Sequence, residues 1–296
     1  MGRRRIQDNA IQLNYMADNY LEKKMEDLRS GRLARVKSNS SLRRGVWCVP
    51  FPCRRVFVTG GARGIGRAIV EEFSRIGCKV AFCDADEVSG AETAYSTGAR
   101  FIHADVSDTD ALKKSMDILF TAWRDIDIIV NNVGVGDFKP FGETTAEDFQ
   151  KVIDVNLKPV FVTVHALATH RESLPYPNDF GGRIINIAST RHMQSEAGTV
   201  AYSASKGGVV SLTHSLMMDM SKYRITVNSI SPGWIETGDY DLLRPEDHSQ
   251  HPSGRVGRPA DVARLCVFLS AVGNDFINGA DIPVDGGMTR KMIYID

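Results

Sequence analysis

From about residue 55 onward, short apolar runs rich in β-branched residues alternate with longer segments whose apolar residues recur at helical spacing. The apolar runs cover residues 56–59, 79–83, 100–106, 126–130 and 182–188, and the longer segments cover 67–76, 108–123, 145–169 and 201–220. Runs of this kind are typical of buried parallel strands, and the longer segments are typical of the helices that cover them. The alternation predicts an α/β fold with a doubly wound parallel sheet in a single domain.

The first 54 residues follow a different pattern. Residues 1–30 are rich in helix formers at roughly helical spacing, Gly31 marks the end of this segment, and residues 31–54 have the composition of a linker. We therefore expect a mainly helical N-terminal extension and linker over 1–54, followed by one folded domain over 55–296.

The net charge is zero, but residues 1–54 carry twelve basic and only five acidic side chains. A basic arm can contact nucleic acid or anionic lipid. Here the arginines are interleaved with acidic residues rather than clustered, and aromatic residues suited to base stacking are not interleaved with them. We therefore favour a solvated helix or a simple extension, and predict neither a nucleic-acid partner nor a membrane partner.

The composition is that of a soluble globular protein, with 43% hydrophobic and 24% charged residues. The five cysteines are odd in number and scattered, which predicts reduced thiols. Cys48 and Cys53 lack a second Cys or His pair at zinc spacing, so no metal site is predicted. No apolar run approaches the roughly eighteen residues of a membrane span, and the N-terminus lacks the apolar segment of a secretory signal. A reducing cytoplasm is the expected compartment.

Three polar residues lie around the end of the apolar run 182–188. Ser189 follows that run directly, where open α/β sheets bind ligands, and Tyr202 and Lys206 would lie one turn apart on the next helix. A free tyrosine has a pKa of about 10, and a cation within about 4–6 Å favours the phenolate. Lowering this pKa to about 7 needs ~4 kcal/mol, which a lysine and a second cation such as a nicotinamide ring could supply. Such a tyrosine could exchange a proton with an alcohol oxygen held by Ser189.

A glycine-rich turn follows the first apolar run. Gly60, Gly64 and Gly66 stand between that run and a helix, so the backbone could approach a pyrophosphate while the helix N-terminus supplies N–H donors. Asp84 ends the second run, about twenty residues beyond the glycines, and suits the hydroxyl groups of a ribose. Asp86 is the less favoured candidate because it falls in the loop beyond.

Further polar residues follow the later runs. Asp105 could receive an adenine amino group or could cap a helix. Asn131, Asn132 and Gly134, at the end of a buried strand, indicate a backbone turn supported by side chains. Asn156 lies among apolar residues of a helical segment, so it should be hydrogen-bonded, either to a helix carbonyl or to a water that it positions.

Together these motifs resemble the short-chain dehydrogenase/reductase family, and the resemblance runs from about Arg55 to Gly287. The matching motifs are Thr59-Gly60-x-x-x-Gly64-Ile65-Gly66, Asp105-Val106, Asn131-Asn132-x-Gly134, Asn156, Ser189, Tyr202-x-x-x-Lys206, Ser231-Pro232-Gly233-x-Ile235-x-Thr237, Arg255-Val256-Gly257-Arg258-Pro259 and Val284-Asp285-Gly286-Gly287. Their order and spacing are specific, although each motif is modest alone. The resemblance implies a Rossmann-like sheet of about seven strands in an NAD(P)-binding catalytic domain. It also implies a homodimer or homotetramer that pairs through the helices carrying Asn156 and Tyr202.

The resemblance implies a role for each matching residue. Tyr202 would be the catalytic acid/base, and Lys206 would lower its pKa and hold the nicotinamide ribose. Ser189 would bind the substrate oxygen, and Asn156 would anchor a proton-relay water. The residues expected to contact the cofactor are Gly60, Arg63, Gly64, Ile65, Gly66, Asp84, Asp105, Val106, Asn132, Gly134, Tyr202, Lys206, Pro232, Gly233, Ile235 and Thr237.

Some positions depart from the family's pattern. Val133 stands where the family usually has alanine, and a small shift could absorb its extra carbons. Residues 173–180 lengthen the connection before Ser189 and, with their prolines and polar residues, should form a surface loop. Residues 238–254 replace the family's pocket lid with a short polar segment, which favours a small or polar substrate. His192 could face the pocket or be a solvent-exposed loop residue, because nothing nearby in the sequence fixes it.

The sequence contains signals for both nicotinamide cofactors. Asp84 suits the free hydroxyls of NAD(H), whereas Arg63 stands where family members that use NADP(H) often keep a basic residue for the 2′-phosphate. Arg63 can also pair with Asp84, which would remove it as a phosphate ligand. We therefore expect NAD(H) to be preferred over NADP(H).

The leading hypothesis is an oxidoreductase that transfers a hydride between NAD and a secondary alcohol or ketone. An NADPH-dependent ketoreductase of 3-oxoacyl thioesters is an alternative within the same fold. A dinucleotide-binding sensor or scaffold is an alternative of another class, because fold alone does not determine activity. The presence of all four candidate catalytic residues disfavours that last hypothesis.

Overall fold

The computed structural model describes residues 54–175 and 178–292. Apart from Arg54, the predicted N-terminal extension and linker lie outside the described residues. The described residues belong to one compact unit.

A seven-stranded parallel sheet in the order β3-β2-β1-β4-β5-β6-β7 forms the centre of this unit. Its strands are β1 (Arg55–Thr59), β2 (Lys79–Asp84), β3 (Arg100–His103), β4 (Ile128–Asn131), β5 (Gly182–Ile187), β6 (Ile225–Pro232) and β7 (Asp281–Val284). The central strands β4, β5 and β6 are buried along their whole length, as expected of a parallel sheet covered on both faces. The predicted Rossmann-like fold is confirmed.

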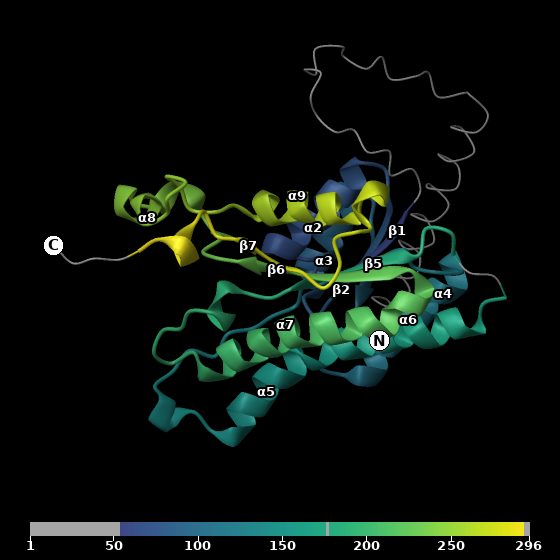
Figure 1. Ribbon diagram of the computed structural model, residues 1–296, viewed down its shortest axis with the longest axis horizontal. Helices are drawn as coiled ribbons and strands as arrows, with labels where there is room; N and C mark the ends of the chain where they lie inside the picture. The colour runs from purple at the N-terminus through teal and green to yellow at the C-terminus, as the bar shows by residue number, and fades with distance from the viewer. Residues whose placement is uncertain (1–53, 176–177, 293–296) are drawn as a thin grey trace, which may run out of the picture. The chain divides into compact units, whose positions relative to one another are not determined.

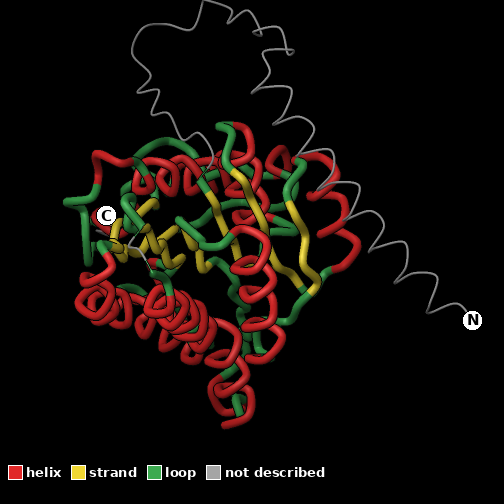
Figure 2. The backbone as a smooth tube through the Cα atoms, turned by 90° about the vertical axis from the view of Figure 1, so that its right-hand side faces the viewer, coloured by secondary structure: helices red, strands yellow, loops and turns green. Residues whose placement is uncertain are grey.

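Helices cover both faces of the sheet. They are α2 (Gly64–Arg75), α3 (Glu87–Thr97), α4 (Thr109–Trp123), α5 (Ala146–Asn156), α6 (Lys158–Ser173), α7 (Val200–Met220), α8 (Pro245–Ser249) and α9 (Pro259–Ser270). Figure 1 shows α2 and α9 on one face and α5, α6 and α7 on the other. In Figure 2 the strands lie between these two helical layers.

The direction of winding reverses between β1 and β4. From β1 the chain proceeds outward through β2 to β3, and it then returns to β4 on the other side of β1 and continues to β7. Thr59 and Asn131, the last residues of β1 and β4, are partners in the sheet register. A reversal of this kind opens a crevice at the carboxyl ends of the strands, so the residues after Thr59 and Asn131 are in the position where such folds bind ligands.

The helix predicted over 145–169 is two helices. α5 ends at Asn156 and α6 begins at Lys158, with Pro159 in its first turn. Proline lacks an N–H and clashes with the preceding turn, so it is tolerated at a helix start rather than inside a helix. Within the described residues, Ala146–Ser173 is the one helical stretch that is long and apolar enough to cross a membrane. Core helices of soluble proteins can have the same length and composition. In this structure the stretch packs on α4 and α7.

A buried charge network lies at the amino-terminal edge of the sheet. Asp127 accepts hydrogen bonds from the Arg55 guanidinium at 2.6 and 2.8 Å, and Asp125 accepts one from Nε of Arg171 at 2.8 Å. Asn178 Nδ2 donates to Asp125 at 2.8 Å and to Asp127 at 3.0 Å. The connection predicted as a surface loop over 173–180 is therefore tied to this buried network in its second half.

Candidate active site

A cavity of about 990 Å³ opens around the switch point between β1 and β4. The predicted site residues that line it are Gly60, Arg63, Ile65, Gly66, Asp84, Asp105, Val106, Asn132, Gly134, Ser189, Tyr202, Lys206, Pro232, Gly233, Ile235 and Thr237. Gly64 and Asn156 are not among its lining residues, although each is next in sequence to one that is. The structure therefore brings the glycine-rich turn and the Ser189–Tyr202–Lys206 group into one cavity.

The glycine-rich turn leads into a helix with an open N-terminus. α2 begins at Gly64, and its N-cap residue Arg63 provides no side-chain cap, so the first N–H groups are open to the oxygen atoms of a ligand. A Cβ atom on Gly66 would overlap the carbonyl oxygen of Gly60, so this close approach requires glycine. Asn132 Nδ2 donates to the same carbonyl at 3.0 Å and holds the turn against β4. This end of the cavity fits the pyrophosphate of a dinucleotide.

Asp84 is fixed at the end of β2 through both carboxylate oxygens. Oδ2 accepts from the backbone N–H of Ala62, and Oδ1 accepts from that of Asp86, each at 3.0 Å. An ionised carboxylate has about four acceptor positions, so two remain for other donors. The geometry fits the two hydroxyl groups of a ribose.

Arg63 pairs with Asp86, and the anticipated pairing with Asp84 is not formed. Nε of Arg63 also donates to the Ser89 hydroxyl at 2.9 Å. Asp86 is the N-cap of α3, where it accepts from the N–H of Ser89 at 3.1 Å, and it lines the cavity beside Asp84. From the sequence, Asp86 was expected in the loop after the second strand and was the less favoured candidate for the ribose contact. In the structure, Asp84 and Asp86 both line the cavity.

Asp105 lines the cavity after β3 and stabilises its own turn, where it accepts from the N–H of Ser107 at 2.9 Å. The N-cap of α4 is instead Asp108, whose carboxylate accepts from Asp110 N and Ala111 N. Of the two roles considered for Asp105, that of a helix cap is therefore wrong. Contact with an adenine stays a prediction.

Ser189, Tyr202 and Lys206 meet at the other end of the cavity. Ser189 lies just beyond the end of β5, and the other two residues lie one turn apart on α7. The Ser189 side chain is hydrogen-bonded to the Tyr202 phenol. Lys206 Nζ donates to the carbonyl oxygen of Ile187 at 2.8 Å and lies 5.7 Å from the centre of the Tyr202 ring. A Cβ atom on Gly134 would come within 3.0 Å of Nζ, so glycine leaves room for the ammonium group.

Burial dominates the electrostatics of this group. It raises the pKa of Tyr202 above its ordinary value, while the hydrogen bond from Ser189 and the charge of Arg191 act in the opposite direction. Burial also lowers the pKa of Lys206 to about 8. The sequence had predicted that Lys206 would lower the pKa of Tyr202. In the structure, the net effect of the protein's own groups is to raise the pKa of Tyr202. The cation that partly offsets this rise is Arg191 rather than Lys206.

Asn156 joins three parts of the site. Its Oδ1 accepts from the backbone N–H of Val135 at 2.8 Å, and its Nδ2 donates to the Val135 carbonyl and to the Ser205 hydroxyl, each at 3.0 Å. Ser205 Oγ donates in turn to the Tyr202 carbonyl at 2.7 Å. Asn156 is therefore satisfied by a neighbouring loop and by α7, and not by a carbonyl of its own helix.

Comparisons with known proteins agree with this geometry. A family model described as enoyl-(acyl carrier protein) reductase matches residues 60–289. A relative from Thermotoga maritima, described as an uncharacterized oxidoreductase, is 44% identical over 80% of this chain and 96% of its own length. An NADP-dependent (R)-specific alcohol dehydrogenase from Lentilactobacillus kefiri is 32% identical over 79% of this chain and 96% of its own length. The chain belongs to the short-chain dehydrogenase/reductase family.

The fold comparison gives the same assignment. A solved structure described as an apo SCOR enzyme from Clostridium thermocellum superposes with a TM-score of 0.74 at 38% identity, covering 81% of this chain and 95% of that one. Members of the family are oxidoreductases that bind a nicotinamide cofactor and act on CH–OH or C=O groups of small molecules. The chain is therefore an enzyme of this type, and the resemblance drawn from its motifs is confirmed.

Two apolar residues lie at the site in ways that the sequence did not fully show, Val133 in the cavity lining and Phe138 against the Tyr202 ring. Val133, which replaces the family's usual alanine, lines the cavity, and its Cγ2 occupies the space that a Cβ atom on Gly60 would need. Phe138 packs edge-on against the Tyr202 ring, with the ring centres 5.6 Å apart, although its own side chain is largely exposed. Phe138 could not be found from the sequence, because no spacing rule links a loop residue after β4 to a helix after β5.

A buried polar ladder behind the site was also missed. Asn131 Nδ2 donates to Asn186 Oδ1 at 2.9 Å, and Asn186 Nδ2 donates to the Thr213 hydroxyl at 2.9 Å. On the other side, the Thr163 hydroxyl donates to Asn131 Oδ1 at 2.8 Å. Asn131 and Asn186 are partners in the β4–β5 register, so a signal existed in the pairing of two asparagines near the ends of buried strands.

His192 adopts neither of the positions considered for it. It is not among the residues that line the cavity, and it is only partly exposed. Its Nε2 lies 3.0 Å from Oδ2 of Asp281 on β7, so a residue 89 positions away fixes it.

Proposed function

We propose that the enzyme interconverts a secondary alcohol and a ketone, with NAD(H) as the preferred cofactor and a small or polar compound as substrate. The observation that carries this proposal is the single cavity that joins Ser189, Tyr202 and Lys206 to the open N-terminus of α2 and to Asp84. At one end this cavity has the groups that hold a dinucleotide, and at the other it has a hydroxyl pair that can bind an alcohol oxygen.

When bound, the nicotinamide ring supplies or accepts the hydride. Tyr202 donates a proton to the carbonyl oxygen in reduction and accepts one from the alcohol in oxidation. Its raised pKa keeps the phenol protonated at neutral pH, which suits it as the proton donor in reduction. Ser189 donates a hydrogen bond to the same substrate oxygen and so orients it toward the phenol.

We assign supporting roles to the other residues of the site. Lys206 is held by the Ile187 carbonyl, and its ammonium group favours the tyrosinate that forms after proton transfer. Asn156 holds the Val135 backbone and, through Ser205, the turn of α7 that carries Tyr202. Its Oδ1 retains one acceptor position, which is sufficient for the relay water that the family resemblance implies. Ile235 and Thr237 line the cavity and are proposed to contact the carboxamide of the cofactor.

The proposed preference for NAD(H) rests on charge. A 2′-phosphate would approach Asp84 and Asp86 together, and one carboxylate ~4 Å from a phosphate repels it by ~4 kcal/mol per unit charge at an effective dielectric constant of ~20. Arg63, the cation in this part of the cavity, already pairs with Asp86. The hydroxyls of an NAD ribose gain hydrogen bonds to Asp84 instead, so we propose a preference of about ten-fold or more, or about 1.4 kcal/mol.

An NADPH-dependent ketoreductase of 3-oxoacyl thioesters remains the second candidate. Two observations favour it: a relative from Mycobacterium tuberculosis, 33% identical, is described as a 3-oxoacyl-[acyl-carrier-protein] reductase, and the Lentilactobacillus relative is described as NADP-dependent. The short polar segment 238–254 favours the first candidate, because it offers few apolar side chains to a long acyl group.

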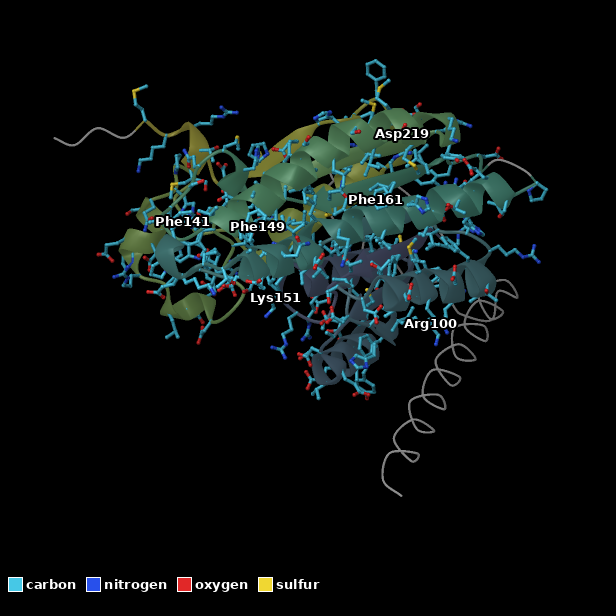
Figure 3. All side chains as sticks on the ribbon, turned by 90° about the horizontal axis from the view of Figure 1, so that it is seen from below. Arg100, Phe141, Phe149, Lys151, Phe161 and Asp219 are labelled. Carbon is cyan, nitrogen blue, oxygen red and sulfur yellow. The ribbon has the colours of Figure 1, made fainter. Side chains whose placement is uncertain are left out.

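We further propose a homo-oligomer that pairs through the outer surface of α5, α6 and α7. Phe149, Phe161 and Met218 are exposed apolar residues of these three helices. Phe149 and Phe161 lie on the side of α5 and α6 that is turned away from the sheet (Figure 3). Exposed aromatic residues on adjacent helices are typical of a surface that a partner covers. Sedimentation of the purified chain tests this proposal, and a monomer at micromolar concentration would contradict it.

The experiment that tests the catalytic proposal is a substrate screen. Purified protein is incubated with polyols, hydroxy acids, cyclic secondary alcohols and 3-oxoacyl thioesters, each with NAD(H) and with NADP(H), while the absorbance of the reduced cofactor is followed. We expect turnover of a small or polar alcohol, with kcat/KM at least about ten-fold higher for NAD(H). An NADP(H) preference with thioester turnover would establish the second candidate. Asp84→Ser should narrow the difference between the two cofactors, because it removes one repelling carboxylate.

A further inference from the structure

His192 connects the turn after Ser189 to the outer strand β7. The turn Thr190–His192 is a single 3-10 turn that begins at Ser189, whose hydroxyl accepts from Arg191 N at 3.2 Å and whose carbonyl accepts from His192 N at 3.1 Å. The imidazole Nε2 of His192 lies 3.0 Å from Oδ2 of Asp281. Both side chains are largely buried, at 15% and 17% exposure.

Asp281 is itself rigidly held. It begins β7 and is the register partner of Ser229 on β6. Its Oδ1 accepts from the hydroxyl groups of Ser229 and Ser231, each at 2.7 Å, and both serines are fully buried. Because Oδ1 takes two hydroxyl donors, Oδ2 is the oxygen that accepts from His192 in the tautomer with a proton on Nε2. The acceptor, Asp281, is therefore fixed by the sheet, and the donor, His192, belongs to the turn that follows Ser189.

The backbone provides little else to fix this turn on the sheet. The last sheet bond before it runs from Ala188 N to Ile230 O at 2.8 Å, and Met193 N and Gln194 N then donate back to Thr190 O within the turn. In the two described ranges, 54–175 and 178–292, the His192–Asp281 bond is the one hydrogen bond that we find from Thr190–His192 to the sheet. The side chain of His192 thus provides an anchor that the backbone lacks.

We infer that His192 is a positioning residue, which holds the Ser189 hydroxyl at the substrate oxygen by tying its turn to Asp281. This inference rests on the role proposed for Ser189. The effect is expected to be large, because a displacement of about 1 Å in a reacting geometry costs on the order of 100-fold in rate. His192 does not line the cavity, so its influence passes through the turn and not through contact with substrate.

The first test is kinetic, with the best compound of the screen as substrate. We expect His192→Ala to lower kcat by about ten-fold or more and to change the Kd for NADH by less than about two-fold, because the turn and not the nucleotide end is loosened. His192→Gln should recover most of the rate, since its amide can donate to Asp281. His170→Ala is the matched control. In the parent, the His170 imidazole is hydrogen-bonded to the Arg124 carbonyl at 2.8 Å and stacks on Phe120, away from the cavity. Its loss should therefore leave kcat unchanged.

A double-mutant cycle separates positioning from general destabilisation. If His192 acts through Ser189, adding His192→Ala to Ser189→Ala should cost little more in single-turnover rate than Ser189→Ala alone. Equal losses in both backgrounds would show a general structural role and overturn the inference. Full activity of Ser189→Ala would instead overturn the role proposed for Ser189, and absence of turnover of every compound in the screen would overturn the proposed function, so these failures are distinct.

The second test needs no substrate. The Ser189 hydroxyl is hydrogen-bonded to the Tyr202 phenol, so the Cζ NMR resonance of Tyr202, identified by its absence in Tyr202→Phe, reports where that hydroxyl lies. We expect Ser189→Ala and His192→Ala to shift this resonance in the same direction, His192→Gln to leave it near its parent position, and the double variant to add no further shift. A His192→Ala spectrum identical to that of the parent would show that the turn does not need its anchor.

Discussion

The guanidinium group of Arg63 pairs with the carboxylate of Asp86, while Asp84 beside it accepts two backbone N–H groups. The Arg63 side chain is 74% exposed, so this pair contributes only about 0–1 kcal/mol to stability. Its importance lies in the cavity, because Asp86 adds a second negative charge near the proposed ribose site and offsets the positive charge of Arg63. We therefore expect cofactor choice in this chain to depend on Asp86 as well as on Asp84.

Asp86→Asn should therefore strengthen NADPH binding. Asparagine still caps α3, so the local fold is kept, but the repelling charge is removed and Arg63 is free to meet a phosphate. We expect the Kd for NADPH to fall by about ten-fold and the Kd for NADH to stay within about two-fold of the parent, measured by fluorescence titration.

Two further variants control this prediction. Asp108→Asn removes an equal charge from the N-cap of the next helix, α4, outside the cavity lining, and should change neither Kd. Adding Arg63→Ala to Asp86→Asn should cancel most of the gain, because the phosphate ligand is lost. If Asp86→Asn binds NADPH no better than the parent, Asp86 has no part in cofactor selection.

The sequence predicted the sheet and most of the cavity because those features depend on local patterns. The run 56–59 and the glycines after it are contiguous, and Tyr202 and Lys206 are joined by helical spacing. What it missed depends on contacts between distant segments. Asp281 lies 89 residues from His192, and Phe138 is 64 residues from the Tyr202 ring that it packs against. The raised pKa of Tyr202 was missed for a related reason, since burial is a property of the assembled site and not of the Tyr-x-x-x-Lys spacing.

Tyr202→Phe should abolish turnover and leave cofactor affinity within a few-fold of the parent. The ring and its edge-on contact with Phe138 are kept, and only the transferable proton is lost. The measurements are kcat with the best substrate and the Kd for NADH. More than about a tenth of the parent activity would show that another group exchanges the proton.

Deleting residues 1–53 should leave a folded and active enzyme. The cut is placed before Arg54 because its carbonyl accepts from Lys79 N at 2.8 Å and its guanidinium lies 3.9 Å from the centre of the Phe180 ring. β1 begins at the next residue, so every strand of the sheet is retained. The comparison uses kcat/KM, thermal melting and sedimentation of the two chains. Loss of activity or of the oligomer would show that the extension takes part in the fold or in the subunit contact.

The last prediction concerns Lys206 and the pH dependence of stability. Burial lowers the pKa of Lys206 from 10.5 to about 8, so between these pH values the unfolded chain binds more protons at this residue than the folded chain does. Folding is therefore opposed by this group below pH 8, and the opposition is relieved as the pH rises toward 10.5. Lys206→Met has no such group, so the free energy of unfolding of the parent should rise relative to that of the variant across this window, by ~3 kcal/mol at most. Lys222→Met is the matched control, since its hydrogen bond to Glu172 raises the pKa of Lys222 and the relative stability of the parent should fall as the pH passes above 10.5. Urea denaturation of the three chains from pH 8 to above pH 10.5 measures both differences. If the difference between the parent and Lys206→Met stays constant or falls between pH 8 and 10.5, the folded enzyme keeps Lys206 charged.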